Sequence, residues 1–189
     1  MSLSDPKLFM LLLGCKPPGR HTEQHDIFFG IAPSLKELVP EINTFWSEAK
    51  KNLHLDAWRQ VFSVKQYTIK PRLKTDKLTT KNSLHLFFIN LGGYKKDEFE
   101  EYHYKMIIVA EDLPAAVVQA KQQLFYKEKG FKGASAHIDD KYGIDVDEAY
   151  SVEDILPKAM SSLYCLEIIE KETTSDTIHL GYLPLWKIK

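Results

Sequence analysis

The chain has 189 residues, of which 44% are hydrophobic and 27% charged, a composition typical of a soluble globular protein and not of a disordered one. Its net charge of −1 gives no basic field that would point to nucleic acid, and the longest apolar run, residues 8–13, is far shorter than a membrane-spanning helix. The two cysteines, Cys15 and Cys165, are too few for a disulfide framework and fit a reducing compartment. We therefore expect a cytoplasmic protein with neither a nucleic-acid nor a membrane partner.

The charges are spread unevenly along the chain. Residues 1–84 carry 13 Lys or Arg and 8 Asp or Glu, whereas residues 85–189 carry 12 and 18. Opposite charges in the two halves favour self-association, although two solvated surfaces that merely differ in charge give the same counts. The sequence identifies no other partner.

A repeated pattern is the most informative feature of the sequence. "EQHDIFFGIA" (residues 23–32) and "EYHYKMIIVA" (residues 101–110) keep Glu, His and Ala at the same spacing, with an offset of 78 residues. The same offset gives nine identities in a 40-residue window, where chance gives about two or three. Such a unit is too long for a solenoid repeat and indicates two related modules. The predicted parts are an N-terminal extension at 1–6, whose start is typical of an expression vector, repeat 1 at 7–70, a polar linker at 71–84, repeat 2 at 85–158 and a tail at 159–189.

In repeat 1 the apolar runs "KLFMLLLG" and "HDIFFGIA" predict a hairpin of two buried strands. Apolar residues at helical spacing follow: Leu35, Leu38, Val39, Ile42 and Trp46. Pro40 would interrupt this helix unless the helix begins at Val39, with the proline in its first turn. Beyond the helix, "LHLDAW" predicts a third strand and "VFSVKQYTI" a fourth.

Repeat 2 has the same order of elements. "HLFFINLG" and "YHYKMIIVA" predict a hairpin, Asp112 is a good N-cap for the helix that follows, and "AHIDDKYGI" predicts the third strand. Two further strands in the tail predict a C-terminal β-hairpin that completes the sheet of repeat 2. The expected fold is therefore α+β, with two tandem β-β-α-β repeats, antiparallel sheets, a pseudo-two-fold relation and a C-terminal hairpin.

The segments "KLFMLLLG", "GRHTEQHDIFFGIA", "LKELVPEINTFW" and "LHLDAW" resemble the bacterial family known as domain of unknown function 1543, in which one chain can carry one or two copies of the domain. The resemblance is close for residues 7–64, weaker for residues 85–158, and does not extend to the tail. It implies the repeat architecture and brings no established activity.

Histidines and carboxylates recur in both repeats. Strand alternation puts Glu23 and His25 on one face, and likewise His54 and Asp56. Repeat 2 offers the corresponding set Glu101, His103, His137 and Asp139. Such clusters can bind a divalent metal or supply a general acid–base pair, and they can equally be hydrogen-bonded structural groups at the edge of a core. Because the familiar metal motifs are missing, no metal is established and no cofactor is predicted.

The loop "GCKPPGRHTEQ" combines Cys15, Lys16 and Arg20 with a backbone stiffened by Pro and Gly. It can present a small anionic pocket or a thiol with a lowered pKa, or it is a stiff exposed hairpin with an inert cysteine. Repeat 2 has Gly93 and Glu98 at the places of Cys15 and Arg20, so this chemistry would belong to repeat 1 alone.

The sequence favours a non-catalytic cytoplasmic binding or interaction module of unknown ligand. The phosphate loops, GxSxG elbow and dinucleotide fingerprint of common enzymes are missing. The alternative is a metal-dependent or acid–base enzyme that uses the His, Glu and Asp clusters of the repeats.

Overall fold

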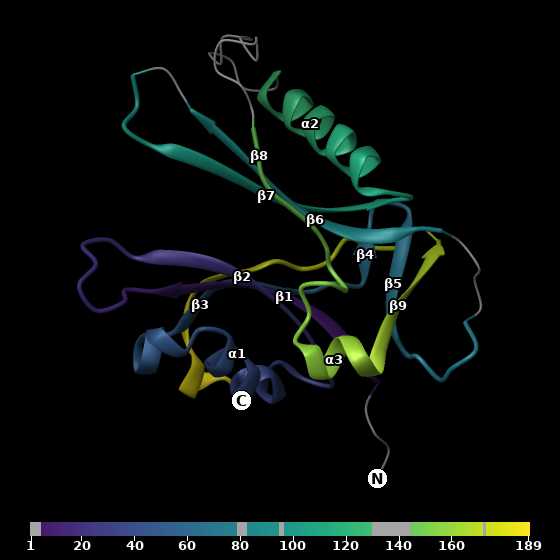
Figure 1. Cartoon of the computed structure of the whole chain (residues 1–189), viewed down its shortest axis with the longest axis horizontal. Helices are drawn as coiled ribbons and strands as arrows, with labels where there is room; N and C mark the ends of the chain where they lie inside the picture. Colours follow the sequence, from purple (N-terminus) through teal and green to yellow (C-terminus); the bar gives the residue numbers. More distant parts are fainter. Residues whose placement is uncertain (1–4, 79–82, 95–96, 130–144, 172) are drawn as a thin grey trace. The chain divides into compact units, whose positions relative to one another are not determined.

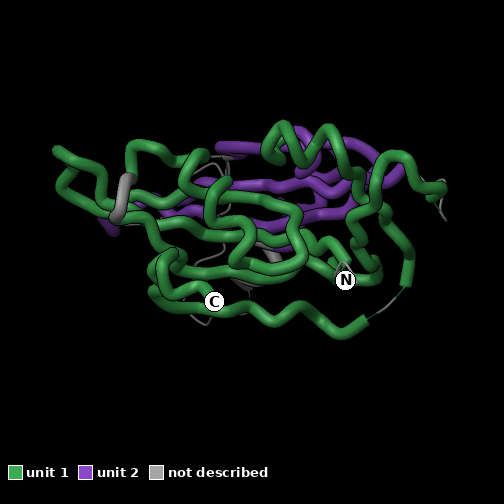
Figure 2. Tube along the Cα trace, turned by 90° about the horizontal axis from the view of Figure 1, so that it is seen from below, with its two compact units in different colours: residues 1–81, 155–189 green, residues 82–154 purple. Residues whose placement is uncertain are grey.

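The structure, a computed structural model, describes residues 5–78, 83–94, 97–129, 145–171 and 173–189 (Figure 1). The chain divides into two compact units (Figure 2). Unit 1 comprises residues 1–81 and 155–189, and unit 2 comprises residues 82–154. Helices and antiparallel sheets are mixed in the chain, so the predicted α+β class is confirmed.

Unit 1 is built on a four-stranded sheet with the order β10-β3-β1-β2. Its first two strands, β1 (Lys7–Cys15) and β2 (Gln24–Ala32), form the predicted antiparallel hairpin, in which Lys7 pairs with Ala32. Alternate residues of β1 point into one hydrophobic core, where Leu11 and Leu13 are fully buried. The other face of the same strands is also apolar along most of its length, with Leu8 and Phe29 buried, and becomes polar only at the end that holds Gly14 and His25.

The helical segment of unit 1 begins with a 3₁₀ turn, η1 (Leu35–Leu38), which leads into α1 (Val39–Phe45). The helix starts at Val39, as the sequence required, so Pro40 lies in its first turn, where no intrahelical N–H is needed. Leu38 and Ile42 are fully buried in the core of unit 1. A second 3₁₀ segment, η2 (Ser47–Asn52), then leads into the third strand.

Strand β3 (His54–Gln60) pairs with β1 on the side opposite β2, and its register contains a bulge. Ala57 lies opposite Leu12 and Leu55 lies opposite Leu13, so Asp56 is the extra residue between them. A bulge bends a strand and re-aims its side chains, and bulges are common next to functional sites. This one places a carboxylate beside His54.

The predicted C-terminal hairpin is wrong, because its two strands lie in different sheets. Strand β9 (Tyr164–Glu170) pairs with β5 (Tyr67–Leu73) in the sheet β4-β5-β9, whereas β10 (His179–Pro184) pairs with the outer edge of β3. The tail strands also do not complete the sheet of residues 85–158, because both of their partners belong to unit 1. By covering β3, strand β10 removes an open sheet edge. The remaining short elements of unit 1 are β4 (Ser63–Val64), α3 (Lys158–Leu163) and η3 (Leu185–Lys187).

Unit 2 contains β6 (His85–Tyr94), β7 (Glu101–Ala110), α2 (Leu113–Lys129) and β8 (Asp145–Ser151), and β6 lies between β7 and β8. As predicted, Asp112 caps α2: its Oδ1 accepts the Ala115 N–H at 2.8 Å. None of the described helices is both long enough and apolar enough to cross a bilayer.

The strand that pairs with β6 on the side opposite β7 is β8, at 145–151. The third strand predicted for repeat 2, residues 136–144, lies outside the described residues. Glu148 lies opposite Asn90 and Val146 opposite Leu91, which leaves Asp147 as the extra residue of a bulge.

Candidate functional site

The four predicted polar residues of repeat 1 meet at one end of the four-stranded sheet, around Gly14 of β1. Gly14 lies opposite His25 on β2 and opposite His54 on β3, so both histidines flank the glycine on the same face. A Cβ atom at Gly14 would lie 2.5 Å from His54 Nε2 and would also collide with Asp56 Oδ2. The missing side chain of the glycine is therefore what lets these groups approach one another.

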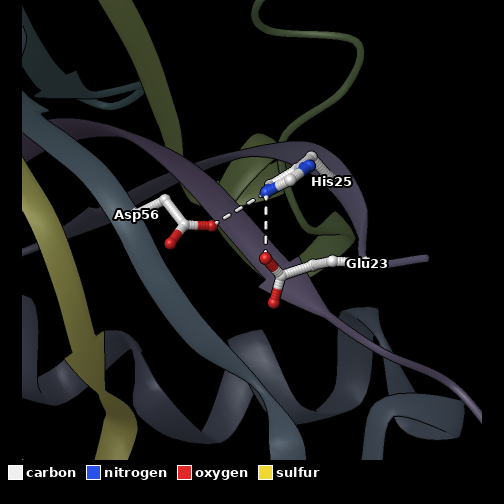
Figure 3. A group of neighbouring side chains, drawn as sticks. All are labelled: Glu23, His25 and Asp56. Carbon is white, nitrogen blue, oxygen red and sulfur yellow. Dashed lines mark ion pairs between the residues drawn. The ribbon is translucent and has the colours of Figure 1, made fainter.

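Four short contacts join the two histidines to two carboxylates. His25 Nε2 lies 3.1 Å from Asp56 Oδ2 and 3.7 Å from Glu23 Oε2. Figure 3 shows these three side chains pointing toward one another from β3 and from the start of β2. His54 Nε2 lies 3.1 Å from Glu23 Oε1 and 3.5 Å from Asp56 Oδ1. The structure thus brings together the side chains that strand alternation had placed on one face.

The buried member of the cluster is His54, which is 3% exposed. Its Nδ1 lies 3.0 Å from the carbonyl oxygen of Asn52, a pure acceptor, so Nδ1 carries a proton and Nε2 is the ring nitrogen that faces the carboxylates. Among the described residues, Nε2 has no hydrogen-bond partner, and neither has Asp56 Oδ2. His54 Nε2 thus lies close to two carboxylates without the geometry of a hydrogen bond to either.

The opposite side of the cluster faces solvent. The side chains of His25 and Glu23 are 41% and 44% exposed, and that of Asp56 is 25% exposed. A small ion can therefore reach the donors from outside and keep a water molecule on its open side.

An aromatic residue that sequence reasoning did not find completes the site. The ring of Tyr182, on β10, packs 4.3 Å from the imidazole of His54, measured between centroids. The β10–β3 register is irregular between Leu180 and Leu183, and within this stretch Gly181 has a φ of +119°, a conformation that favours glycine. The kink places Tyr182 over His54.

A smaller cluster lies at the corresponding end of the unit 2 sheet, where ligand atoms of Glu101, His103 and Asp147 lie within 4.8 Å of one another. Asp147 has the place in this cluster that Asp56 has in unit 1. The bulge in β8 places it there, and no sequence match of "HLD" with "HID" could reveal the bulge. His137 and Asp139 lie outside the described residues.

The three candidate residues of the loop differ in their exposure to solvent. Lys16 and Arg20 are exposed, whereas Cys15 is fully buried with its Sγ 3.8 Å from the carbonyl oxygen of Ala49. Burial, and next the charge of Glu23, raise the pKa of the Cys15 thiol. This direction is opposite to the lowered pKa that a nucleophilic cysteine needs.

Residues 20–73 match the family described as Domain of Unknown Function (DUF1543). This confirms the resemblance to that family over the segment that holds Glu23, His25, His54 and Asp56. The chain is also similar to a solved structure described as a protein Il1583 from Idiomarina loihiensis, with 26% identity, 96% of this chain and 98% of that chain covered, and a TM-score of 0.64. A search of curated proteins finds no match.

Proposed function

We propose that this chain is a binding protein whose unit 1 site holds a divalent transition-metal ion through Glu23, His25, His54 and Asp56. The observation that carries the proposal is the Nε2 atom of His54, a buried ring nitrogen with no hydrogen-bond partner among the described residues, facing two carboxylates. A buried polar atom without a partner costs about 1–3 kcal/mol, and a bound cation removes this cost.

The distances within the cluster suit a shared ion. Ligand atoms at about 2.0–2.2 Å from one metal in tetrahedral or octahedral geometry lie about 3–3.6 Å apart. The four contacts between the histidines and the carboxylates span 3.1 to 3.7 Å. Ligand atoms of Glu23, His25 and Asp56 lie within 4.8 Å of one another, and His54 contacts the second oxygen of each carboxylate. Two imidazoles with two carboxylates form a donor set that suits Zn²⁺ and its neighbours, such as Co²⁺ and Ni²⁺.

A metal-free alternative is an ion-pair network in which His54 is an imidazolium. That alternative needs the Nε2–H of His54 to donate to Glu23 or Asp56. Both carboxylates are near enough, yet neither forms a hydrogen bond with Nε2. The carbonyl of Asn52 already fixes the orientation of the ring through Nδ1, as outer-shell carbonyls do for ligating histidines. The arrangement therefore favours coordination over ion pairing.

We further infer that the two units are copies of one β-β-α-β module, the two-copy form of the family. The register supports this: Lys7 pairs with Ala32 in β1–β2, and His85, 78 residues after Lys7, pairs with Ala110, 78 residues after Ala32. The bulges of β3 and β8 also fall at equivalent points of β1 and β6, after Leu12 and Asn90.

A cytoplasmic location is also part of the proposal. Neither Cys15 nor Cys165 forms a disulfide, which suits a reducing compartment.

The test is elemental analysis of the purified, untagged chain together with Co²⁺ titration followed by absorption spectroscopy. We expect one equivalent of metal at the unit 1 site and Co²⁺ d–d bands that His25→Ala and His54→Ala remove. His21→Ala is the matched control, because His21 is an exposed histidine on the adjoining loop and outside the cluster, and it should leave the bands unchanged.

His25 is exposed, so its variant keeps the fold even if His54→Ala does not. No retained metal, no Co²⁺ spectrum and no change of Tm with Zn²⁺, Co²⁺ or Ni²⁺ would together overturn the proposal. The histidines would then be structural ion-pair residues.

A further inference from the structure

We propose that unit 2 carries a second, separate cation site, formed by Glu101, His103 and Asp147, that prefers a harder ion such as Mn²⁺ to the ions favoured by the unit 1 site. No residue is shared between the two sites. The inference therefore stands whether or not the unit 1 site holds a metal.

The three side chains are arranged around one imidazole. His103 Nδ1 forms a hydrogen bond with Asp147 Oδ2 at 3.0 Å, and His103 Nε2 lies 3.8 Å from Glu101 Oε2. The other oxygen of Glu101, Oε1, accepts the hydroxyl of Tyr94 at 2.8 Å, so the phenol orients the carboxylate and leaves Oε2 toward the histidine. The same hydrogen bond raises the pKa of Tyr94, as expected for a phenol that donates to a carboxylate.

A glycine again forms the base of the cluster. Gly92 of β6 lies opposite His103 on β7, and a Cβ atom at Gly92 would come within 2.6 Å of both carboxylate oxygens of Asp147. Gly93, the next residue, has open space at the same place. The close approach of backbone and carboxylate is therefore specific to the residue that faces the cluster.

A buried amide beside the cluster lacks one partner. Asn90 is 6% exposed, its Nδ2 donates to Glu148 at 2.7 Å, and the same nitrogen lies 3.3 Å from His103 Nδ1. Its Oδ1 is buried and has no hydrogen-bond partner among the described residues. A cation held by His103 brings its own water molecules, and a metal-bound water is a strong donor for such an oxygen.

The preference for a harder ion follows from the register. His54 lies opposite Gly14 in unit 1, whereas the residue opposite Gly92 in unit 2 is Asp145. Among the described residues, the cluster of unit 2 therefore offers one imidazole where unit 1 offers two. Imidazole ligands suit Zn²⁺, Cu²⁺ and Ni²⁺, whereas carboxylate and water ligands suit Mn²⁺, Mg²⁺ and Ca²⁺. Exchanging one ring nitrogen for oxygen donors shifts the preference toward the second group.

The experiment is a Mn²⁺ titration of the full chain, followed by loss of the electron paramagnetic resonance signal of free Mn²⁺. We expect wild type and His21→Ala to bind Mn²⁺ alike, because His21 is exposed and outside both clusters, and His103→Ala to weaken binding at least about tenfold. Asp147→Asn keeps the shape of the side chain and should weaken binding as well. Co²⁺ binding at the unit 1 site should be unchanged in both unit 2 variants, so a failure of one site is distinguished from a failure of the other.

The two glycines provide a matched pair for the same titration. Gly92→Ala should weaken Mn²⁺ binding, because its new methyl group displaces Asp147, whereas Gly93→Ala should bind as wild type does. Absence of Mn²⁺ binding at millimolar concentration, or Mn²⁺ binding that His103→Ala and Asp147→Asn leave intact, would overturn the proposal.

Discussion

Gly14 lies directly opposite His54 in the β1–β3 pair, and a Cβ atom on the glycine would come to 2.5 Å from the Nε2 atom of the imidazole. The backbone of β1 thus forms the base of the unit 1 site, and the side chains of the neighbouring strands close over it. Gly92 has the corresponding relation to the Asp147 carboxylate in unit 2. Both glycines are explained by close approach and neither by a backbone conformation that only glycine adopts.

The first prediction concerns Gly14→Ala. The added methyl group must push away the His54 imidazole and the Asp56 carboxylate, so the four donors can no longer share one ion. We expect Zn²⁺ or Co²⁺ affinity at the unit 1 site to fall at least about tenfold, because displacing even the supporting groups of a metal site costs 10- to 100-fold in affinity. Isothermal titration with Co²⁺ measures the change.

The control for Gly14→Ala is Gly93→Ala, where nothing lies within 4 Å of the new Cβ atom. This variant should leave Co²⁺ binding unchanged. Co²⁺ affinity of Gly14→Ala equal to that of wild type would show that the ion does not need the observed convergence of His54 and Asp56.

The second prediction concerns Tyr182, which packs on the His54 ring. Tyr182→Ala removes this contact and exposes the buried imidazole to water, so we expect weaker Co²⁺ binding and altered d–d bands. Tyr182→Phe keeps the aromatic ring and should resemble wild type. Leu180→Ala is the matched control, because Leu180 is 81% exposed on the same strand. Equal Co²⁺ binding by the Ala and Phe variants of Tyr182 would show that the aromatic ring of Tyr182 does not contribute to the site.

The third prediction concerns the Cys15 thiol, whose pKa burial raises. The thiolate is the nucleophile, so native Cys15 should react with iodoacetamide at pH 7.5 at least about tenfold more slowly than in urea. The measurement uses Cys165→Ser, which leaves Cys15 as the single thiol. A native rate equal to that of the unfolded chain would restore the reactive-cysteine interpretation of the loop.

Local patterns in the sequence were enough to predict the hairpins β1–β2 and β6–β7, the helix α2, and the proximity of the four polar residues of repeat 1. Alternation along a strand predicted Glu23 with His25, and His54 with Asp56, and in the structure the bulge of β3 at Asp56 keeps that carboxylate beside His54. The position of Pro40 likewise predicted where α1 begins, because proline is tolerated in the first turn of a helix and not in its interior.

Features that depend on distant pairing could not be predicted from the sequence. The bulge that selects Asp147 depends on how β8 pairs with β6, and a bulge has no fixed sequence signal. The position of β10 beside β3 depends on which sheet edge is open, so Tyr182 was not recognised as part of the site. Adjacent strands with a turn between them also favour a hairpin locally, and tertiary pairing overrode that preference in the tail.

The fourth prediction concerns Asp176, whose Oδ1 accepts the backbone N–H groups of Phe62 and Ser63 at 3.1 and 2.9 Å. Asp176→Ala leaves these donors without their acceptor, so we expect the free energy of unfolding to fall by about 1–3 kcal/mol. Asp176→Asn keeps an acceptor oxygen and should cost less. Urea unfolding at pH 7 measures both changes.

The pH dependence of the same variants gives a signed test. Burial raises the pKa of Asp176, and its hydrogen bonds and the charge of Arg59 only partly oppose this. The folded state therefore holds the proton more tightly than the unfolded state, whose carboxyl titrates near pH 3.9. The contribution of the protonated Asp176 carboxyl to the free energy of unfolding is therefore fully present below the unfolded-state pKa. It is lost as the pH rises through the folded-state pKa of Asp176. Wild type should thus gain stability relative to Asp176→Asn as the pH is lowered from 7 to 4. A relative loss over this range would mean that the ionised carboxylate, with its two N–H donors and Arg59, is the better bound form.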